Sequence, residues 1–363
     1  RSSDLVPLLE FDGVNWAVYP IHNAKMRTVK AGEDGRIYVG GLQQFGYFVP
    51  NKLGRLDYVC LSDSIDKHMI GNIWNIHIAG NRIYFQSDHA IFYLEKERLH
   101  QIACRDIIYS ALVDKRLYVA GNGLSVLNGD TLLQLPNSTS YINNMSKRIV
   151  GIFPYQNKLL LVSNQHGLFF YENGTFVPFR STADEFLKKN RLRCATMKGP
   201  LLALGTVQNG LLLLNLDTGS TEHISTHNGL QNKAILSLFF DREENLWLGL
   251  DNGIDCVHLH SPAFQNSTPI GSGYTSCLYK NKLYLGTNQG VFIADYPLGL
   301  NKEQEIKPLE GMVGQIYSLS VYDDKLFCAG SNSLGVLDDN EFYIIPNIRG
   351  GWWVKSLRLK DKL

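Results

Sequence analysis

The sequence predicts an all-β fold, a β-propeller built from four-stranded antiparallel blades. A unit of short apolar strands separated by polar turns recurs along nearly the whole chain, with a mean period of about 41 residues. Such a period, with several strands per unit, is typical of propeller blades. The second strands of the eight copies centre on Ile37, Ile83, Leu117, Leu159, Leu202, Leu246, Leu283 and Leu326.

The N-terminal stretch 8–20 predicts two strands around Asp12-Gly13, because Asp-Gly between alternating apolar residues favours a hairpin. We expect these strands to be the outer pair of a blade whose inner strands come from elsewhere. In each of the eight following copies, a small residue stands third in the first strand, which suits a strand facing a narrow central channel. These residues are Thr28, Asn75, Ser110, Gly151, Cys194, Ser237, Ser276 and Ser318.

Turn glycines, one short helix and a C-terminal repeat copy are also expected from the sequence. Glycines that close the polar turns are expected at positive φ; they are Gly123, Gly167, Gly210, Gly253 and Gly290. Residues 182–189 predict a short helix, with Thr182 as N-cap and Glu185 completing a capping box. A ninth copy opens at Trp352-Trp353, and we expect 352–360 to be an inner strand that lies near the N-terminal hairpin, with one of the two tryptophans buried.

Composition argues against several classes of function. The 363 residues carry a net charge of +1 without clustering of either sign, so we expect no nucleic-acid surface. No apolar run is long enough to cross a bilayer, so we expect no membrane contact by this segment. The six cysteines include no Cys-x-x-Cys pair, and we expect buried thiols in place of disulfides or a metal site.

Candidate ligand-binding residues stand at the starts of the inner strands, on the propeller face that also carries polar loops. Arginines and flat aromatic rings around such a mouth suit a carbohydrate, which needs hydrogen bonds and a stacking surface. The alternative is that the polar loops are only what tight turns demand. The candidates are Arg27, Trp74, Tyr109, Arg148, Arg193, Tyr274, Tyr317 and Trp352.

The sequence offers no catalytic or metal-binding constellation. Aspartates such as Asp34 and Asp251 fall at repeated turn positions, which does not suit the paired carboxylates of a glycosidase. His258 and His260 alternate along a strand, but no third ligand stands near them. We therefore expect no catalytic residue, no metal and no cofactor.

One copy carries a family resemblance. The pattern from Ile235 through Asp241 and Asn245-Leu246-Trp247-Leu248-Gly249 to Gly253 resembles the regulator-propeller repeat of bacterial two-component sensors. The opening stretch, from Leu9 to Phe48, looks like the start of the periplasmic sensor regions of Bacteroides-type hybrid two-component systems. In the other copies Tyr, Leu, Ala or Phe replaces Trp247.

The resemblance implies more than the repeat itself. Members of that family have two seven-bladed propellers, then a triple-tyrosine immunoglobulin-like domain, a membrane helix, a kinase and a DNA-binding output; a sister group has a helix-turn-helix output. They work as dimers and sense oligosaccharides. By this resemblance residues 1–363 would be one propeller segment of about eight copies, with seven blades favoured over eight and a few terminal residues belonging to a neighbouring propeller.

The leading interpretation is therefore a non-catalytic periplasmic sensor module that recognises, or helps to recognise, an oligosaccharide. Two alternatives remain open at this point. A propeller glycosidase or polysaccharide lyase would require a catalytic carboxylate or a metal at the channel mouth. A protein-binding scaffold propeller is disfavoured because the Gly-His and Trp-Asp pairs of that class are absent from the sequence.

Overall fold

The computed structural model describes residues 7–21, 25–52, 54–104, 106–144, 149–259, 270–296, 306–339 and 341–355. The chain forms two compact units. The first contains Arg1–Asn209, Leu214–Ser220 and Ala234–Val257, and the second contains Gly210–Leu213, Thr221–Lys233 and His258–Leu363.

The eight repeat copies fold as eight antiparallel sheets whose strands pair in sequence order. The first three are β3–β6 (Met26–Ala31, Ile37–Gly41, Gln44–Pro50, Leu56–Cys60), β7–β10 (Ile73–Ala79, Arg82–Ser87, Ala90–Glu95, Arg98–Ala103) and β11–β14 (Tyr109–Val113, Arg116–Gly121, Gly123–Asn128, Thr131–Gln134). The next three are β15–β18 (Ile149–Tyr155, Lys158–Ser163, Leu168–Glu172, Thr175–Phe179), β19–β22 (Leu192–Lys198, Leu201–Thr206, Leu211–Asn215, Thr221–Ile224) and β23–β25 (Ile235–Phe240, Leu246–Leu250, Ile254–Val257). The last two are β26–β29 (Gly273–Tyr279, Lys282–Thr287, Gly290–Asp295, Lys307–Val313) and β30–β33 (Ile316–Tyr322, Lys325–Gly330, Leu334–Asp338, Glu341–Ile344).

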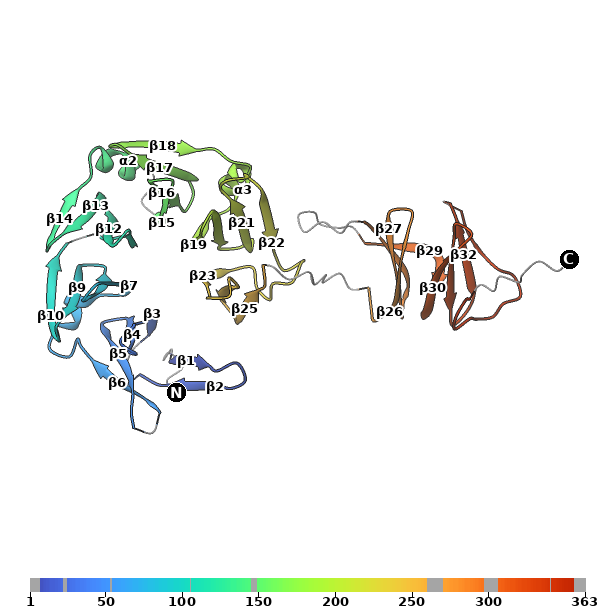
Figure 1. Ribbon diagram of the computed structural model, residues 1–363, viewed down its shortest axis with the longest axis horizontal. Coiled ribbons are helices and arrows are strands. Elements are labelled where there is room, and N and C mark those ends of the chain that lie inside the picture. The colour runs from blue at the N-terminus through green and yellow to red at the C-terminus, as the bar shows by residue number, and fades with distance from the viewer. Residues whose placement is uncertain are drawn as a thin grey trace. The chain divides into compact units, whose positions relative to one another are not determined.

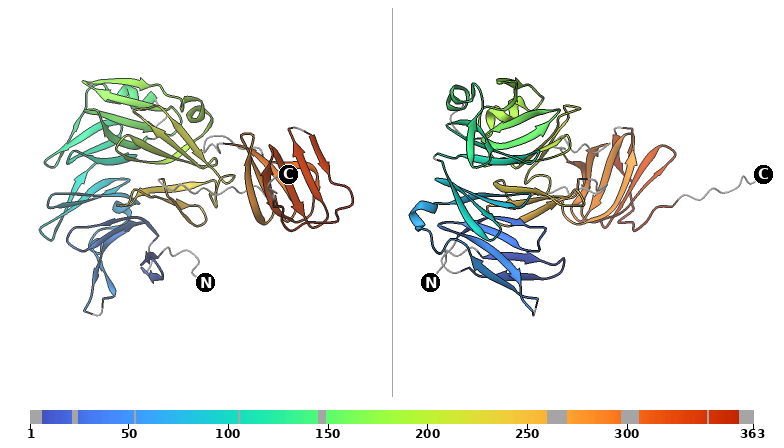
Figure 2. Two further views of the ribbon diagram at one scale, coloured as in Figure 1. Left: turned by 45° about the vertical axis from the view of Figure 1, so that its right-hand side comes forward. Right: turned by 60° about the vertical axis from the view of Figure 1, so that its left-hand side comes forward.

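Successive sheets of the first unit are the blades of a propeller. The first strand of each blade contacts the first strand of the next, in the order β3, β7, β11, β15, β19 and β23. The fourth strands β6, β10, β14 and β18 lie at the outer rim (Figure 1), and the same blades remain neighbours in the views of Figure 2. In the second unit β26 contacts β30 in the same way. The predicted all-β propeller fold of antiparallel blades is confirmed.

One detail of the predicted blades differs. The sheet β23–β25 has three strands among the described residues, and residues 260–269, which follow it, lie outside the described part of the chain. The eight residues on which the copies were centred all fall in second strands, as predicted; they belong to β4, β8, β12, β16, β20, β24, β27 and β31.

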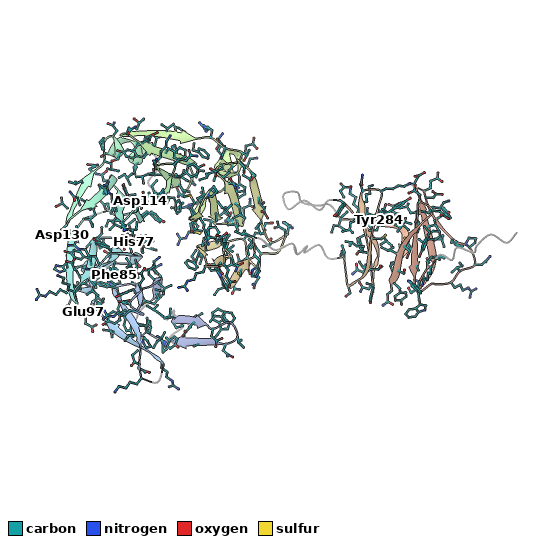
Figure 3. All side chains as sticks on the ribbon, viewed as in Figure 1. His77, Phe85, Glu97, Asp114, Asp130 and Tyr284 are labelled. Carbon is teal, nitrogen blue, oxygen red and sulfur yellow. The ribbon has the colours of Figure 1, made fainter. Side chains whose placement is uncertain are left out.

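The core of the first unit lies between neighbouring blades. Tyr38 and Phe45 of one blade pack against Ile73, Phe85 and Phe92 of the next in a single buried cluster. The rings of Phe45 and Phe85 are 4.6 Å apart, and Figure 3 shows where Phe85 lies within the second blade. Because both faces of a blade are covered in this way, its second and third strands are continuous runs of apolar residues.

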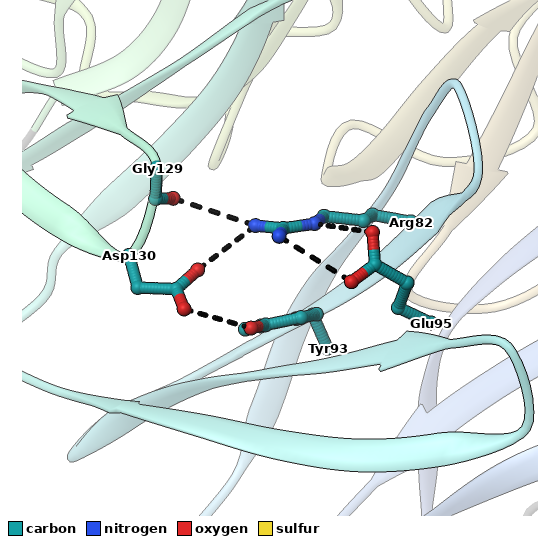
Figure 4. Close-up of polar contacts among 5 residues, drawn as sticks. All are labelled: Arg82, Tyr93, Glu95, Gly129 and Asp130. Carbon is teal, nitrogen blue, oxygen red and sulfur yellow. Dashed lines mark hydrogen bonds and ion pairs between the residues drawn. The ribbon is translucent and has the colours of Figure 1, made fainter.

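Ion pairs also join neighbouring blades. At the start of β8, the Arg82 guanidinium donates to both carboxylate oxygens of Glu95, at 2.9 and 3.4 Å, and to Asp130 of the next blade at 2.9 Å (Figure 4). The guanidinium also lies over the Tyr93 ring, whose hydroxyl donates to Asp130. These hydrogen bonds keep the pKa of Arg82 above its usual value despite partial burial. A cavity of about 190 Å³ lies beside Arg82.

The N-terminal hairpin is present as predicted. Strands β1 (Leu8–Phe11) and β2 (Trp16–Tyr19) pair antiparallel around the Asp12 turn. Asp12 Oδ1 accepts hydrogen bonds from the backbone N–H groups of Val14 (2.8 Å) and Asn15 (2.6 Å), which lowers the Asp12 pKa. One face of this hairpin packs against the blade β3–β6.

The helix prediction is correct in place but wrong in its cap. Helix α3 is Asp184–Lys189, and Ala183 is its N-cap residue. Ala183 makes no side-chain cap hydrogen bond, and the side-chain contacts at this end of the helix come from Ser181 and Asp184, one residue before the predicted pair of Thr182 and Glu185. Ser181 Oγ accepts from the Ala183 N–H, and Asp184 Oδ1 accepts from the Ser181 N–H at 3.1 Å. Thr182 instead donates its hydroxyl proton to the carbonyl of Gly219.

Two short helices were not predicted, α1 (Lys67–Ile70) and α2 (Ser138–Asn144). The predicted strand at 352–360 is wrong for its described part, because residues 352–355 form no strand. Both tryptophans are exposed, Trp352 by 77% and Trp353 by 67%, so the expected burial of one of them is also wrong. Residues 356–360 lie outside the described part of the chain.

Candidate functional site

A β-bulge recurs at the start of the inner strands. The pairing with the second strand skips one residue there, so that residue has no partner in the ladder. Bulges of this kind re-aim a side chain, and they are common beside binding sites. The skipped residues are Arg27, Trp74, Val150, Arg193, Leu236, Tyr274 and Tyr317. Five of the eight predicted candidates occupy this position.

The first unit brings two of these candidates together. The guanidinium carbon of Arg27 lies 4.7 Å from the centroid of the Trp74 ring. Arg27 Nε donates to Asn72 Oδ1 at 2.9 Å, and Trp74 Nε1 donates to Asp88 Oδ1 at 2.6 Å. Asn72 in turn donates to Asp88 Oδ2 through its backbone N–H (2.9 Å) and its side chain (3.1 Å). We call Arg27, Asn72, Trp74 and Asp88 the arginine–tryptophan cluster.

Asp88 is the charged centre of this cluster. Partial burial acts to raise its pKa, but hydrogen bonds from the Trp74 indole and from Asn72 outweigh burial and lower it. The carboxylate is therefore ionised at neutral pH. Both of its oxygens are engaged by donors from the neighbouring loop and strand, which fixes the indole on which Arg27 rests.

The second unit brings three other candidates together in a row. The Tyr317 ring stacks on the Trp352 ring, with centroids 4.5 Å apart and planes 9° from parallel. The Tyr274 ring also contacts Tyr317, with a centroid distance of 6.1 Å and planes tilted by 56°. The Tyr317 hydroxyl donates to Gln315 Oε1 at 2.6 Å. Since Tyr274 is 50% exposed and Trp352 is 77% exposed, this aromatic row presents flat apolar surface to solvent.

The structure places the remaining candidates outside both groups. Tyr109, the first residue of β11, lies opposite Ala120, the register that Asn75 occupies opposite Gln86. It therefore holds the position equivalent to Asn75, the third residue of β7, and not the bulged position. Its ring is packed between blades, and this burial raises its pKa to about 12. Arg193 is exposed at the bulge of β19 and belongs to neither group. Arg148 lies outside the described residues.

The shifted register of Tyr109 also changes which residues stand at the positions predicted to be small. In the structure, Tyr109 and Thr275 hold the register expected for Ser110 and Ser276, because the inner strands β11 and β26 are each shifted by one residue against the sequence-based alignment. A bulky residue at one such position is accommodated because the ring packs between blades. The five predicted turn glycines all have positive φ.

Most polar loops after the second strands serve the turns themselves. Ser87, Thr206 and Thr287 each accept a hydrogen bond on the side-chain oxygen from a backbone N–H two or three residues later. Asp88 is an exception, because its carboxylate reaches across to Trp74. Asp88 and Asn72 are the partners that sequence reasoning missed. Asp88 lies in one of the polar loops expected from the sequence, but only the fold shows which strand it faces.

The described residues offer neither a metal site nor a disulfide. They contain no group of three His, Cys, Asp or Glu side chains that could hold a metal ion, and His260 of the predicted strand pair lies outside them. All six cysteines are free thiols, and Cys328 is buried, which raises its pKa to about 12. In the part of the chain that the structure covers, no helix has the length and hydropathy to span a bilayer.

The protein is similar to known proteins in structure, while comparisons of its sequence find no match. No protein-family model matches the sequence, and no curated protein matches it. The structure is similar to the extracellular domain of a hybrid two component system, BT3049, from B. thetaiotaomicron, with a TM-score of 0.58 and 15% sequence identity over 93% of this chain. It is also similar to virginiamycin B lyase from Staphylococcus aureus, with a TM-score of 0.50 and 16% identity over 68% of this chain and 85% of the lyase.

These similarities support the propeller fold expected from the repeat. The chain spans 55% of the length of the B. thetaiotaomicron domain. At 15–16% sequence identity, what these proteins share is the propeller architecture. The same architecture carries unrelated functions, so the similarity does not transfer a function to this chain.

Proposed function

We propose that this chain is a non-catalytic, extracytoplasmic sensor module that takes part in recognising an oligosaccharide. The proposal rests on the similarity in fold to an extracellular domain of a two component system and on the surface chemistry at the bulged positions. In the full protein the module would act in the periplasm, as part of a homodimer, and pass its signal to an output domain that controls transcription.

The observation that carries the ligand class is the exposed aromatic row of Tyr274, Tyr317 and Trp352. A pyranose ring has one apolar face of C–H groups, which packs on a flat aromatic ring and leaves its hydroxyl groups free for hydrogen bonds. The Tyr317–Trp352 stack offers such a flat surface, and Gln315 beside it supplies an amide that can bond to a sugar hydroxyl. The row is too exposed to be explained by core packing alone.

Isothermal titration of the protein in its full encoded length against a panel of polysaccharide-derived oligosaccharides tests this proposal. We expect one member or a related group to bind. We expect Trp352→Ala to weaken that binding by roughly 5- to 30-fold, because stacking on one aromatic ring is worth about 1–2 kcal/mol. Trp353→Ala is the matched control: Trp353 is similarly exposed, and Lys355 lies over its ring. Absence of binding to every member, or equal loss in the two variants, would contradict the proposal.

The same panel of oligosaccharides distinguishes a sensor module from an enzyme. Turnover of an oligosaccharide, abolished by one Asp or Glu substitution near the inner-strand starts, would establish a glycosidase or lyase and overturn the non-catalytic part of the proposal.

A further inference from the structure

The arginine–tryptophan cluster holds a guanidinium in a fixed position but leaves part of it unused. Arg27 Nε is bonded to Asn72, and one face of the group lies on Trp74. Among the described residues, no carboxylate forms an ion pair with Arg27, and its two terminal nitrogens make no hydrogen bond. Arg27 is exposed, so these nitrogens are accessible from solvent.

Other arginines of the same unit show what a purely structural guanidinium looks like here. Arg36 lies over the Tyr47 ring and forms an ion pair with Glu97 of the next blade at 2.9 Å. Arg82 lies over the Tyr93 ring and forms ion pairs with Glu95 and Asp130. Each combines an aromatic ring below the guanidinium with carboxylates at its edge. Arg27 has the ring but, in the part of the chain that the structure describes, no carboxylate at its edge.

The nearby carboxylate of Asp88 forms no ion pair with the Arg27 guanidinium. Both oxygens of Asp88 are engaged by Trp74 and Asn72, and Asn72 rather than Asp88 contacts Arg27. Asp88 therefore positions the indole and the amide, which in turn hold the guanidinium. A guanidinium with a fixed plane and free terminal N–H groups matches a planar carboxylate or a sulfate in two parallel hydrogen bonds.

We propose that the arginine–tryptophan cluster binds the carboxylate or sulfate group of an acidic oligosaccharide. This inference rests on the proposed function, since it names the class of oligosaccharide that the module takes. Arg27 is the residue that contacts the anion. Trp74, Asn72 and Asp88 are positioning residues that hold the Arg27 side chain.

Matched pairs of acidic and neutral probes test the inference by isothermal titration. One pair is an oligogalacturonide and its carboxyl-reduced counterpart; the other is a sulfated disaccharide and its desulfated form. We expect the acidic member of one pair to bind at least 10-fold more tightly than its neutral form, and its affinity to fall as salt is raised. Preference within the first or the second pair identifies the anion as carboxylate or sulfate.

Substitutions at Arg27 test whether the arginine–tryptophan cluster causes the tighter binding of the acidic probe. We expect Arg27→Gln to weaken acidic binding at least 10-fold and Arg27→Lys to weaken it less, because lysine keeps the charge but loses the two-pronged geometry. Arg242→Gln, which removes an exposed arginine in the turn before β24, should change affinity by less than 2-fold. Melting temperatures of the three variants check that each remains folded.

The outcomes separate this inference from the proposed function. Tight binding of neutral members with no effect of Arg27→Gln would overturn the acidic-group inference and leave the oligosaccharide proposal standing. Equal losses in Arg27→Gln and Arg242→Gln would reduce the effect to net charge and also overturn it. Failure of the full-length protein to bind any probe or any panel oligosaccharide would overturn both.

Discussion

At the scale of single residues, His77 on β7 shows how an inner strand holds a half-buried titratable group against the next blade; Figure 3 labels this residue. Its Nε2 lies 2.8 Å from Ser110 Oγ, which donates to Gln86 Oε1, and Asn75 donates to the same Gln86 oxygen. Burial, helped by the positive charge of Lys30, lowers the His77 pKa from 6.5 to about 4. The neutral ring is therefore the form that fits this network.

This shift predicts a pH dependence of stability. Because the folded protein holds the His77 pKa below the unfolded value of 6.5, the unfolded state binds the proton first as pH falls. The stabilisation that neutral His77 gives the folded state is complete above pH 6.5 and is lost as pH falls toward 4. At about 1.4 kcal/mol per pKa unit, the loss in the free energy of unfolding is roughly 3 kcal/mol at most. Urea unfolding between pH 7.5 and 4 should show a steeper loss in the native protein than in His77→Gln. Parallel curves would contradict this assignment.

At the scale of elements, the repeat motif is explained by one turn. Asp241 Oδ1 accepts from the backbone N–H groups of Glu243 and Asn245, and its Oδ2 accepts from Trp247 Nε1 at 2.9 Å. In the first copy the Tyr38 hydroxyl donates to the turn aspartate Asp34 at 2.7 Å. A tyrosine thus takes over the role of the tryptophan, so the motif varies in sequence between copies while the strand–turn–strand geometry persists.

The short helices mark the limit of sequence-based prediction. A helix of four residues, such as α1, is too short to show helical periodicity, and its signal is the Asp66 side chain that caps it. The segment 181–185 contains three residues that could cap a helix, and only the fold shows that Ser181 and Asp184 make the contacts. Strand positions were predictable because short apolar runs bounded by polar turns leave a pattern in the sequence. The one-residue shift at Tyr109 leaves no such pattern.

The observed cap makes a prediction at the same scale. Asp184→Ala removes the carboxylate that accepts from the Ser181 N–H, and we expect a loss of about 0.5–1 kcal/mol in the free energy of unfolding. Glu185→Ala should cost only a few tenths of that amount, because Glu185 is exposed and makes no capping contact among the described residues. Chemical denaturation measures both. A larger loss for Glu185→Ala would favour the cap predicted from sequence.

At the scale of the whole molecule, periodicity predicts the propeller but not how many blades close one ring. Each blade interface is built from contacts between adjacent copies, so the pattern looks the same wherever the series stops. The candidate site was predictable to a similar degree. Five of the eight candidates lie at bulged strand starts, but which of them meet depends on the bulges and on loops such as the one carrying Asp88. The predicted proximity of the two chain ends involves residues 356–360, outside the described residues, and stays a prediction.

The N-terminal hairpin has two unlike faces, and these give the last prediction. Leu8 and Tyr19 belong to the cluster around Val39 and Phe48, and the Tyr19 and Phe48 rings are 6.0 Å apart. The opposite face carries Trp16, which is 53% exposed and stacks on Phe11. Burying a large apolar side chain is worth about 1.5–3 kcal/mol. Tyr19→Ala should therefore lower the melting temperature by several degrees.

Trp16→Ala is the matched control for this prediction. It removes an aromatic residue from the same strand, β2, but from the face that the described residues leave uncovered. We expect a change of less than about 0.5 kcal/mol, the size usual for a surface substitution. Differential scanning fluorimetry compares the two variants directly. If Trp16→Ala destabilises as much as Tyr19→Ala, the outer face must be covered in solution, and the hairpin would then be buried on both sides like the other blades.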